Sequence, residues 1–179
     1  MKKVLLGMSG GVDSSVSAII LKKQGYEVIG LTMILCGEEN SSAIEDARRV
    51  CEKLNIEHHV ADLRNEFKKN VIDNFICSYM QAKTPNPCVE CNKYMKFNEF
   101  YKIAQDLGCD YIATGHYAKI EYSEKYKQYV LTKSNSDRKD QTYFLYGINK
   151  EILPQILFPL AEFGDKTEIR KIAEEYDLN

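Results

Sequence analysis

Four short apolar segments alternate with four segments of helical periodicity over residues 3–114, and this alternation limits the fold more than any other feature. The expected strands cover residues 3–8, 26–33, 56–61 and 110–114, and the expected helices cover residues 13–24, 41–54, 64–82 and 94–107. Strands that alternate with helices through short connections favour a parallel sheet. The sequence therefore predicts an α/β fold, a Rossmann-like parallel sheet with helices on both faces.

The rest of the chain is expected to be less regular. The patterns predict a hairpin and two helices, over residues 119–122 with 128–133, 140–147 and 167–176. The last stretch is too small to fold alone, so it either packs on the main domain or is the cut end of a longer chain. We place a domain boundary between residues 148 and 149.

Charge and hydropathy exclude some classes of protein. The chain has 179 residues with a formal net charge of −2, which does not by itself indicate a nucleic-acid partner. Residues 119–150 carry seven basic side chains against four acidic ones, a weak local asymmetry that ordinary solvated surface charge also explains. No run of 18 apolar residues is present, so we expect no membrane span and a cytoplasmic protein.

Six cysteines are many for a chain of this length and class. Four of them, Cys36, Cys51, Cys77 and Cys109, follow strand or helix patterns and are expected to be mostly buried free thiols. Cys88 and Cys91 lie instead in a loop with two prolines, predicted over residues 83–92. A half zinc site would explain this pair, but a complete site needs two more ligands and no second C-x-x-C is present.

A glycine-rich loop over residues 9–15 joins the first strand to the first helix and has the composition of a phosphate site. Two glycines let the backbone N–H groups approach an anion, and the following helix directs its positive end at the same point. The loop lacks both the Gly-Lys-Ser/Thr of a Walker A motif and the Gly-x-Gly-x-x-Gly of dinucleotide sites. A plain Gly-Gly turn with helix-capping residues is the structural alternative.

The first and fourth predicted strands end at the same edge of the sheet. Ligands of such sheets bind at the carboxyl ends of the strands. Residues 8–11 and 114–116 both lie at carboxyl ends, so we expect one site to use both segments.

The loop sequence Ser-Gly-Gly-Val-Asp-Ser-Ser resembles the signature of the PP-loop ATP pyrophosphatases, which have an adenine nucleotide α-hydrolase-like fold. This resemblance implies that ATP is cleaved between its α and β phosphates and that a carbonyl oxygen of the substrate is adenylated. It also implies that Asp13 orders the loop or a Mg²⁺ ion. Synthetases for NAD, GMP, asparagine and argininosuccinate share the signature, so the loop alone does not identify the substrate.

Three further motifs narrow the choice. Residues 84–93 read TPNPCVECNK, residues 113–117 read ATGHY, and residues 139–145 read KDQTYFL. Together with the loop and Met33 they resemble the tRNA-specific 2-thiouridylases, in the same order and over nearly the whole chain. The resemblance implies an ATP-binding catalytic domain over residues 1–148 and the start of a tRNA-binding segment over residues 149–179.

The resemblance also assigns roles to individual residues. ATP-binding roles fall on Gly7, Met8, Ser9, Gly10, Gly11, Val12, Asp13, Ser14, Ser15, Met33 and Gly115. Catalytic roles fall on Cys91 as the nucleophile, on Cys88 and on Asp13. Contacts with tRNA or its target base fall on Asn86, Pro87, Cys88, His116, Lys139, Asp140 and Gln141.

The implied reaction is ATP-dependent thiolation of the tRNA wobble uridine through a base adenylated at its C2 oxygen. A persulfide carrier protein or inorganic sulfide would donate the sulfur. Many family members carry Asp where Cys88 stands, so Cys88 and Cys91 are also candidate ligands of a [4Fe-4S] cluster. The alternatives are another PP-loop ATP pyrophosphatase and a non-catalytic ATP- or metal-binding remnant. A nucleophilic role for Cys91 predicts a lowered thiol pKa, because Lys93, Lys96 and the start of the next helix are near it in sequence.

Overall fold

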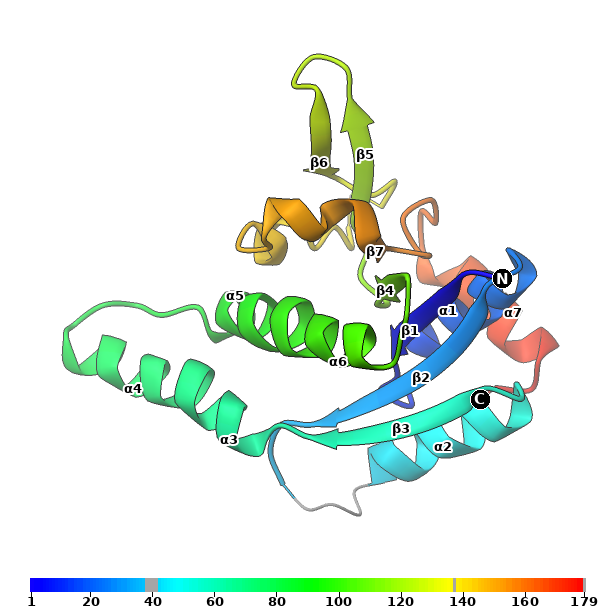
Figure 1. The fold of residues 1–179 in the computed structure, drawn as a ribbon, viewed down its shortest axis with the longest axis horizontal. Coiled ribbons are helices and arrows are strands. Elements are labelled where there is room, and N and C mark those ends of the chain that lie inside the picture. Colours follow the sequence, from blue (N-terminus) through cyan, green and yellow to red (C-terminus); the bar gives the residue numbers. More distant parts are fainter. Residues whose placement is uncertain (38–41, 137, 179) are drawn as a thin grey trace.

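A parallel sheet forms the centre of the molecule in a computed structural model that describes residues 1–37, 42–136 and 138–178. The strands of this sheet are β1 (Lys3–Gly7), β2 (Glu27–Ile34), β3 (Glu57–Asp62), β4 (Tyr111–Ala113) and β7 (Ile156–Leu157). Within the described residues their order is β3-β2-β1-β4-β7, and every neighbouring pair is parallel (Figure 1). The predicted Rossmann-like α/β fold is therefore confirmed.

Helical segments connect the strands, and the last helix comes after the last strand of the sheet. They are α1 (Val12–Lys23), α2 (Ser42–Lys53), α3 (Arg64–Phe67), η1 (Lys68–Ile72), α4 (Asp73–Met80), α5 (Pro87–Glu90), η2 (Cys91–Glu99), α6 (Phe100–Asp106), η3 (Thr142–Leu145), η4 (Lys150–Gln155) and α7 (Lys166–Glu175). The chain stays helical from α3 through α4 and again from α5 through α6, with π-helical windings η1 and η2 inside each run. An antiparallel hairpin, β5 (Lys119–Ser123) with β6 (Gln128–Thr132), stands apart from the main sheet (Figure 1).

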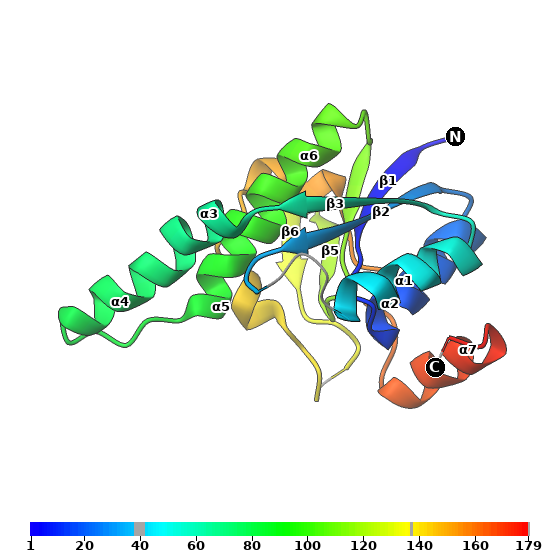
Figure 2. The same cartoon turned by 90° about the horizontal axis from the view of Figure 1, so that it is seen from below.

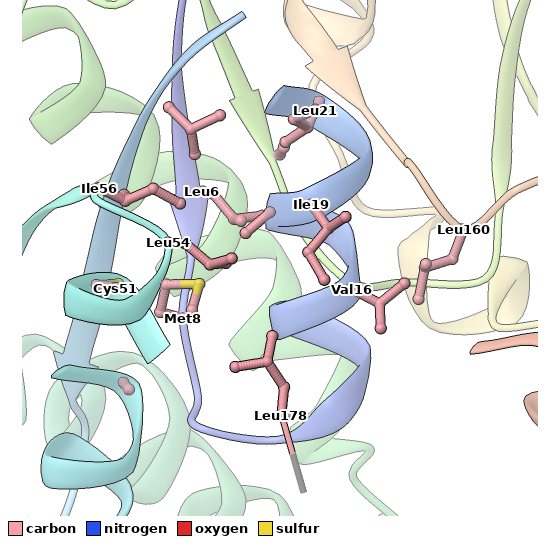
Figure 3. Close-up of a cluster of buried hydrophobic side chains, with 14 of the residues drawn as sticks. Leu6, Met8, Val16, Ile19, Leu21, Cys51, Leu54, Ile56, Leu160 and Leu178 are labelled. Atoms are coloured by element: carbon pink, nitrogen blue, oxygen red, sulfur yellow. The ribbon is translucent and has the colours of Figure 1, made fainter. Parts of the chain in front are cut away.

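Apolar side chains of the central strand β1 point to both faces of the sheet and build two cores. Leu6 packs with Val16 and Ile19 of α1 and with Ile169 of α7 on one face, where α2 also lies (Figures 2 and 3). Leu5 packs on the other face with Phe100 at the start of α6. These side chains are at most 2% exposed. Close packing on both faces therefore holds β1 in position between two layers of helices.

The end of the chain adds to the main sheet. β7 pairs with β4, and Ile169 and Ala173 of α7 are buried in the core beside α1. This strand was missed because the apolar run around it is very short and contains no alternation. The domain boundary between residues 148 and 149 stays a prediction. Residues 149–178 pack on the main domain, which was the first of the two alternatives given for this stretch.

Most predicted elements are confirmed to within a few residues, but two segments were wrong. The loop predicted over residues 83–92 becomes helical from Pro87, and the helix predicted over residues 140–147 is only the 3₁₀ turn η3. Residue 41, predicted as the start of the second helix, lies outside the described residues. The prediction that these cysteines are mostly buried was also partly wrong, since Cys51 is buried while Cys36 and Cys77 are exposed.

Among the residues that the structure describes, none of the helices has the length and apolar character needed to cross a membrane.

Candidate nucleotide site and adjoining cysteine turn

A cavity of about 500 Å³ opens at the carboxyl ends of β1, β2 and β4. Sheet order changes direction between β1 and β4, and such points are where open α/β sheets bind ligands. The lining residues are Gly7, Met8, Ser9, Asp13, Ser14, Leu31, Thr32, Met33, Ile34, Leu35, Cys36, Ala43, Ile44, Lys96, Thr114, Gly115, His116 and Gln141. The expectation that segments 8–11 and 114–116 contribute to one site is therefore met by Met8, Ser9 and residues 114–116.

Residues 9–15, the phosphate loop, hold their shape through short-range hydrogen bonds. The Ser9 backbone N–H and the Ser9 hydroxyl each lie 3.3 Å from the Ser14 hydroxyl oxygen. The Ser14 and Ser15 hydroxyls donate to the Gly11 carbonyl at 2.9 and 3.0 Å. Gly11 is the N-cap of α1 and has no side-chain cap, so N–H groups at the start of α1 are left for an anion.

The two loop glycines serve different purposes. Gly10 has φ +74°, and a Cβ there would lie 2.7 Å from Asp46 Cβ and 2.8 Å from the Ala43 carbonyl oxygen of α2. Gly10 is therefore required by the fold. Gly11 has negative φ, and a Cβ there would meet only the Ser9 hydroxyl at 3.5 Å. Gly11 is exposed, so its missing side chain leaves the space in front of the α1 N-terminus open.

Asp13 is fixed by residues from later parts of the chain. Its Oδ1 accepts a hydrogen bond from the Tyr117 hydroxyl at 3.2 Å, and its Oδ2 pairs with Lys166 Nζ at 2.9 Å. Burial and the Asp13 carboxylate raise the pKa of Tyr117, which therefore stays protonated and donates. Lys166 is the first residue of α7, so the last helix brings a cation to the phosphate loop.

Residues 114–116 form the opposite wall. A Cβ at Gly115 would lie 3.2 Å from the Asp13 carbonyl carbon and 3.3 Å from the Ser14 nitrogen, so only glycine lets the two segments pack closely. His116 is 7% exposed, and its Nδ1 lies 2.7 Å from the Thr114 hydroxyl. Burial, with a smaller contribution from Lys96, lowers the pKa of His116 to about 3, so its ring is neutral near pH 7.

Residues 86–92, the cysteine turn, begin a helix rather than precede one. Asn86 is the N-cap, and its Oδ1 accepts from the Val89 N–H at 3.4 Å. Cys88 is exposed in the first turn, and Cys91 lies farther along, half-buried. The expected low pKa for Cys91 is wrong in this structure, because burial raises its thiol pKa while Lys96 lowers it by a smaller amount.

The cysteine turn adjoins the cavity without lining it. Cys91 packs against the same small buried cluster, Leu63, Val71 and Met95, as Met33 and Leu35 do, and the last two residues line the cavity. Neither Cys88 nor Cys91 is on the cavity wall. The described residues contain no group of three or more His, Cys, Asp or Glu side chains arranged to hold a metal ion. Cys88 and Cys91 would supply two of the four ligands that a [4Fe-4S] cluster takes, so this cluster stays a prediction.

The predicted tRNA-contacting segment, residues 139–141, reaches the same cavity through Gln141. The Gln141 backbone N–H donates to the Tyr117 carbonyl at 2.9 Å, and Gln141 Oε1 accepts from the Tyr117 N–H at 2.9 Å. Asp140 Oδ1 accepts from the Ser134 N–H and from the Thr142 hydroxyl, at 3.2 and 2.7 Å. Only Lys139 of this triplet is fully exposed, so it is the member available to a phosphate.

The structure thus divides the predicted site residues into two groups. Those on the cavity wall are Gly7, Met8, Ser9, Asp13, Ser14, Met33, Gly115, His116 and Gln141. Those away from the wall are Gly10, Gly11, Val12, Ser15, Asn86, Pro87, Cys88, Cys91, Lys139 and Asp140. Sequence reasoning did not place Thr32 or Lys96 on the cavity wall, and it missed the pairing of Lys166 with Asp13. A lone lysine in a helical pattern gives no signal of the site that it reaches.

The family model for the tRNA methyl transferase HUP domain matches residues 2–179. The chain belongs to this family. It is 52% identical over 187 aligned residues to a protein of Clostridioides difficile and 53% identical over 188 to one of Clostridium botulinum. Both carry the name tRNA-specific 2-thiouridylase MnmA. The matches cover 99% of this chain, which spans about half the length of these curated relatives.

Two solved structures share the fold. A 4-thiouridine synthetase in complex with RNA and bound ATP matches with TM-score 0.61 and 22% identity, over 99% of this chain and 41% of that one. An NH₃-dependent NAD synthetase of Campylobacter jejuni matches with TM-score 0.57 and 22% identity, over 99% of this chain and 65% of that one. At this identity the likeness establishes the architecture and leaves the substrate to other evidence.

Proposed function

We propose that this chain is the nucleotide-binding part of an ATP-dependent tRNA 2-thiouridylase acting in the cytoplasm. The observation that carries the proposal is the phosphate loop, whose free N–H groups and serine hydroxyls lie at the edge of a cavity of about 500 Å³. The names of relatives about half identical to this chain support tRNA thiolation as the reaction.

The residues present fit ATP with Mg²⁺. The loop would take the β- and γ-phosphates at the start of α1, and Met33 with the end of β2 gives an apolar wall that suits an adenine ring. Mg²⁺ is commonly held by one or two carboxylates and the substrate phosphates. Asp13 is the carboxylate that lines the cavity within the described residues, so it would supply that ligand.

In the proposed reaction, the C2 oxygen of the wobble uridine attacks the α-phosphate and pyrophosphate leaves. With a persulfide carrier protein as donor, the outer persulfide sulfur then attacks C2 and AMP leaves with the original oxygen. A thiolate next attacks the inner sulfur, which releases 2-thiouridine and leaves a disulfide between that thiol and the carrier. With sulfide as donor, the sulfide attacks C2 directly and AMP leaves. Cys91 is the proposed thiol of this second step, and no step is assigned to an iron–sulfur cluster. The chain would contribute positioning and charge neutralisation to the first step.

Recognition of tRNA is proposed for the surface beside the cysteine turn. Asn92 of the turn donates to the Phe144 carbonyl at 3.3 Å, so the turn and η3 lie side by side. Tyr143 and Tyr146 are about 70% exposed there, and Lys139, which is near them in sequence, is also exposed. Exposed aromatic rings beside cations suit unstacked bases and phosphates of an anticodon loop.

The test is a reaction with ATP and unmodified tRNA, followed by pyrophosphate measurement and mass spectrometry of the tRNA nucleosides. We expect pyrophosphate release that depends on tRNA, and 2-thiouridine when a sulfur donor is present. Pyrophosphate release with a carboxylate or amide substrate but not with tRNA would favour another ATP pyrophosphatase. Methylated tRNA formed from S-adenosylmethionine, in line with the family model's name, would also contradict the proposal.

A further inference from the structure

Lys96 reaches the nucleotide cavity from the same helix that carries Cys91. The two residues are five positions apart, which would place them on different sides of an α-helix. They lie in η2, a π-helical winding whose hydrogen bonds join residues five apart, for example the Phe100 N–H and the Met95 carbonyl. This winding turns Lys96 towards the same side as Cys91, and such windings occur frequently at functional sites.

The ammonium of Lys96 has no hydrogen-bonding or ion-pair partner in the described part of the chain, although the side chain is only partly exposed. Lys96 and Asp13 are the charged residues among those lining the cavity. Asp13 is already paired with Lys166 at the other end of the site. A partly buried cation without a protein anion is best stabilised by an anion that binds beside it.

Within the described part of the chain, Lys96 is the cation that acts on the Cys91 thiol. The charge-bearing groups that influence the thiol are Lys96, which favours the thiolate, and Cys88, which opposes it. The elements packed against Cys91 present apolar side chains, Leu63, Phe67 and Val71, with Tyr94 on its own helix. Lys96 and His116 both line the cavity, and Lys96 lies in η2 with Cys91, so the ammonium is shared by the cavity and the helix that carries the thiol.

We propose that Lys96 is a site residue that holds negative charge where the nucleotide cavity meets Cys91, with the α-phosphate on one side and the Cys91 thiolate on the other. This inference rests on the proposed function. During sulfur transfer the departing AMP and the attacking sulfur both carry negative charge, and one fixed ammonium serves both. The step adds no covalent chemistry, and Lys96 keeps its proton throughout.

The experiment compares Lys96→Met with Lys93→Met, because Lys93 lies on the same helix, is exposed and does not line the cavity. Iodoacetamide alkylation of Cys91 is measured against pH on the whole 179-residue chain, with peptide mass spectrometry to separate Cys91 from the other cysteines. Calorimetric titration with AMP, which contains the α-phosphate, is the second readout. Thermal unfolding establishes that each variant is folded, and Lys96→Arg serves as the charge-conserving variant.

We expect Lys96→Met to move the alkylation midpoint of Cys91 upward by about 0.5–1 pH unit and to weaken AMP about five- to tenfold. Lys96→Arg should restore most of both effects, and Lys93→Met should leave both unchanged. An unchanged midpoint or an unchanged AMP affinity in folded Lys96→Met overturns the inference. Failure of the proposed function is distinguishable, because it would appear as absent ATP binding or absent tRNA thiolation in the wild-type chain.

Discussion

The phosphate loop and the cysteine turn are held in place in different ways. The backbone of the loop is shaped by hydrogen bonds between residues at most five positions apart, while the Asp13 side chain is held by Tyr117 and Lys166 from later segments. The cysteine turn has a local cap at Asn86 and also a distant partner, the bond from Asn92 to the Phe144 carbonyl 52 positions away. The backbone of the phosphate loop is therefore prepared locally, whereas the Asp13 carboxylate and the cysteine turn depend on how separate segments pack.

The largest expected effect separates the two thiols of the cysteine turn. Cys91→Ser in the whole protein should abolish 2-thiouridine formation from a persulfide donor, because a hydroxyl cannot cleave the S–S bond that holds the transferred sulfur. Cys88→Asp should retain activity if sulfur arrives as a persulfide, since the tRNA-specific 2-thiouridylases that the sequence resembles often carry Asp at this position. The measurement is nucleoside mass spectrometry of tRNA, with protein purified both with and without air. Full thiolation by Cys91→Ser under both conditions would remove Cys91 from the mechanism.

The next effect concerns the buried wall opposite the loop. The pKa of His116 lies near 3 in the folded protein against 6.5 in the unfolded one, so the unfolded state binds more protons between these pH values. Stability is therefore fully present above pH 6.5 and falls as the pH drops towards 3, by up to about 5 kcal/mol from this group.

His116→Gln should flatten that part of the pH profile of the unfolding free energy, because glutamine does not titrate and still offers a partner to Thr114. His59→Gln is the matched control, because His59 is partly exposed, with 36% of its side chain accessible. Denaturant unfolding at a series of pH values measures both. Equal acid sensitivity in wild type and His116→Gln would mean that His116 is not held neutral by burial.

A third effect tests whether the phosphate loop depends on the positive φ of Gly10 and on its close packing against α2. Gly10→Ala should destabilise the fold by about 2–4 kcal/mol, from a strained positive φ and from overpacking against α2. Gly164→Ala is a suitable control, since a Cβ there has nothing within 4 Å. Thermal unfolding compares them. If Gly10→Ala melts with wild type, the close contact between the loop and α2 is not part of the native packing.

These differences also explain what the sequence could predict. The strand-helix alternation and the loop motif are local patterns, so the fold and residues 9–15 were predictable from them. The helical start at Pro87 was missed because two prolines suggested a loop, although Pro at N1 with an Asn cap favours a helix. Lys96 and Lys166 reach the site only through tertiary packing, which no local pattern contains.

The smallest effect is expected for the proposed tRNA surface. Lys139→Ala should weaken tRNA binding modestly and reduce the slope of log affinity against log salt by about 1, as expected for one lost phosphate contact. Lys127→Ala on the hairpin is a control, since that lysine is paired with Glu124 at 2.6 Å. Binding measured over a salt series tests this. Unchanged affinity and slope would place the tRNA away from Lys139.

The most direct test of the account is a calorimetric titration of ATP into the wild-type chain and into Gly11→Val. Among the described residues, a Cβ at Gly11 would meet only the Ser9 hydroxyl, at 3.5 Å, so the variant should melt close to wild type. It would nevertheless occupy the space in front of the α1 N-terminus where the phosphates are proposed to bind. We predict that ATP binds the wild type and that Gly11→Val weakens it by at least about 1–3 kcal/mol. Unchanged ATP affinity in a folded Gly11→Val would contradict the assignment of this loop as the phosphate site.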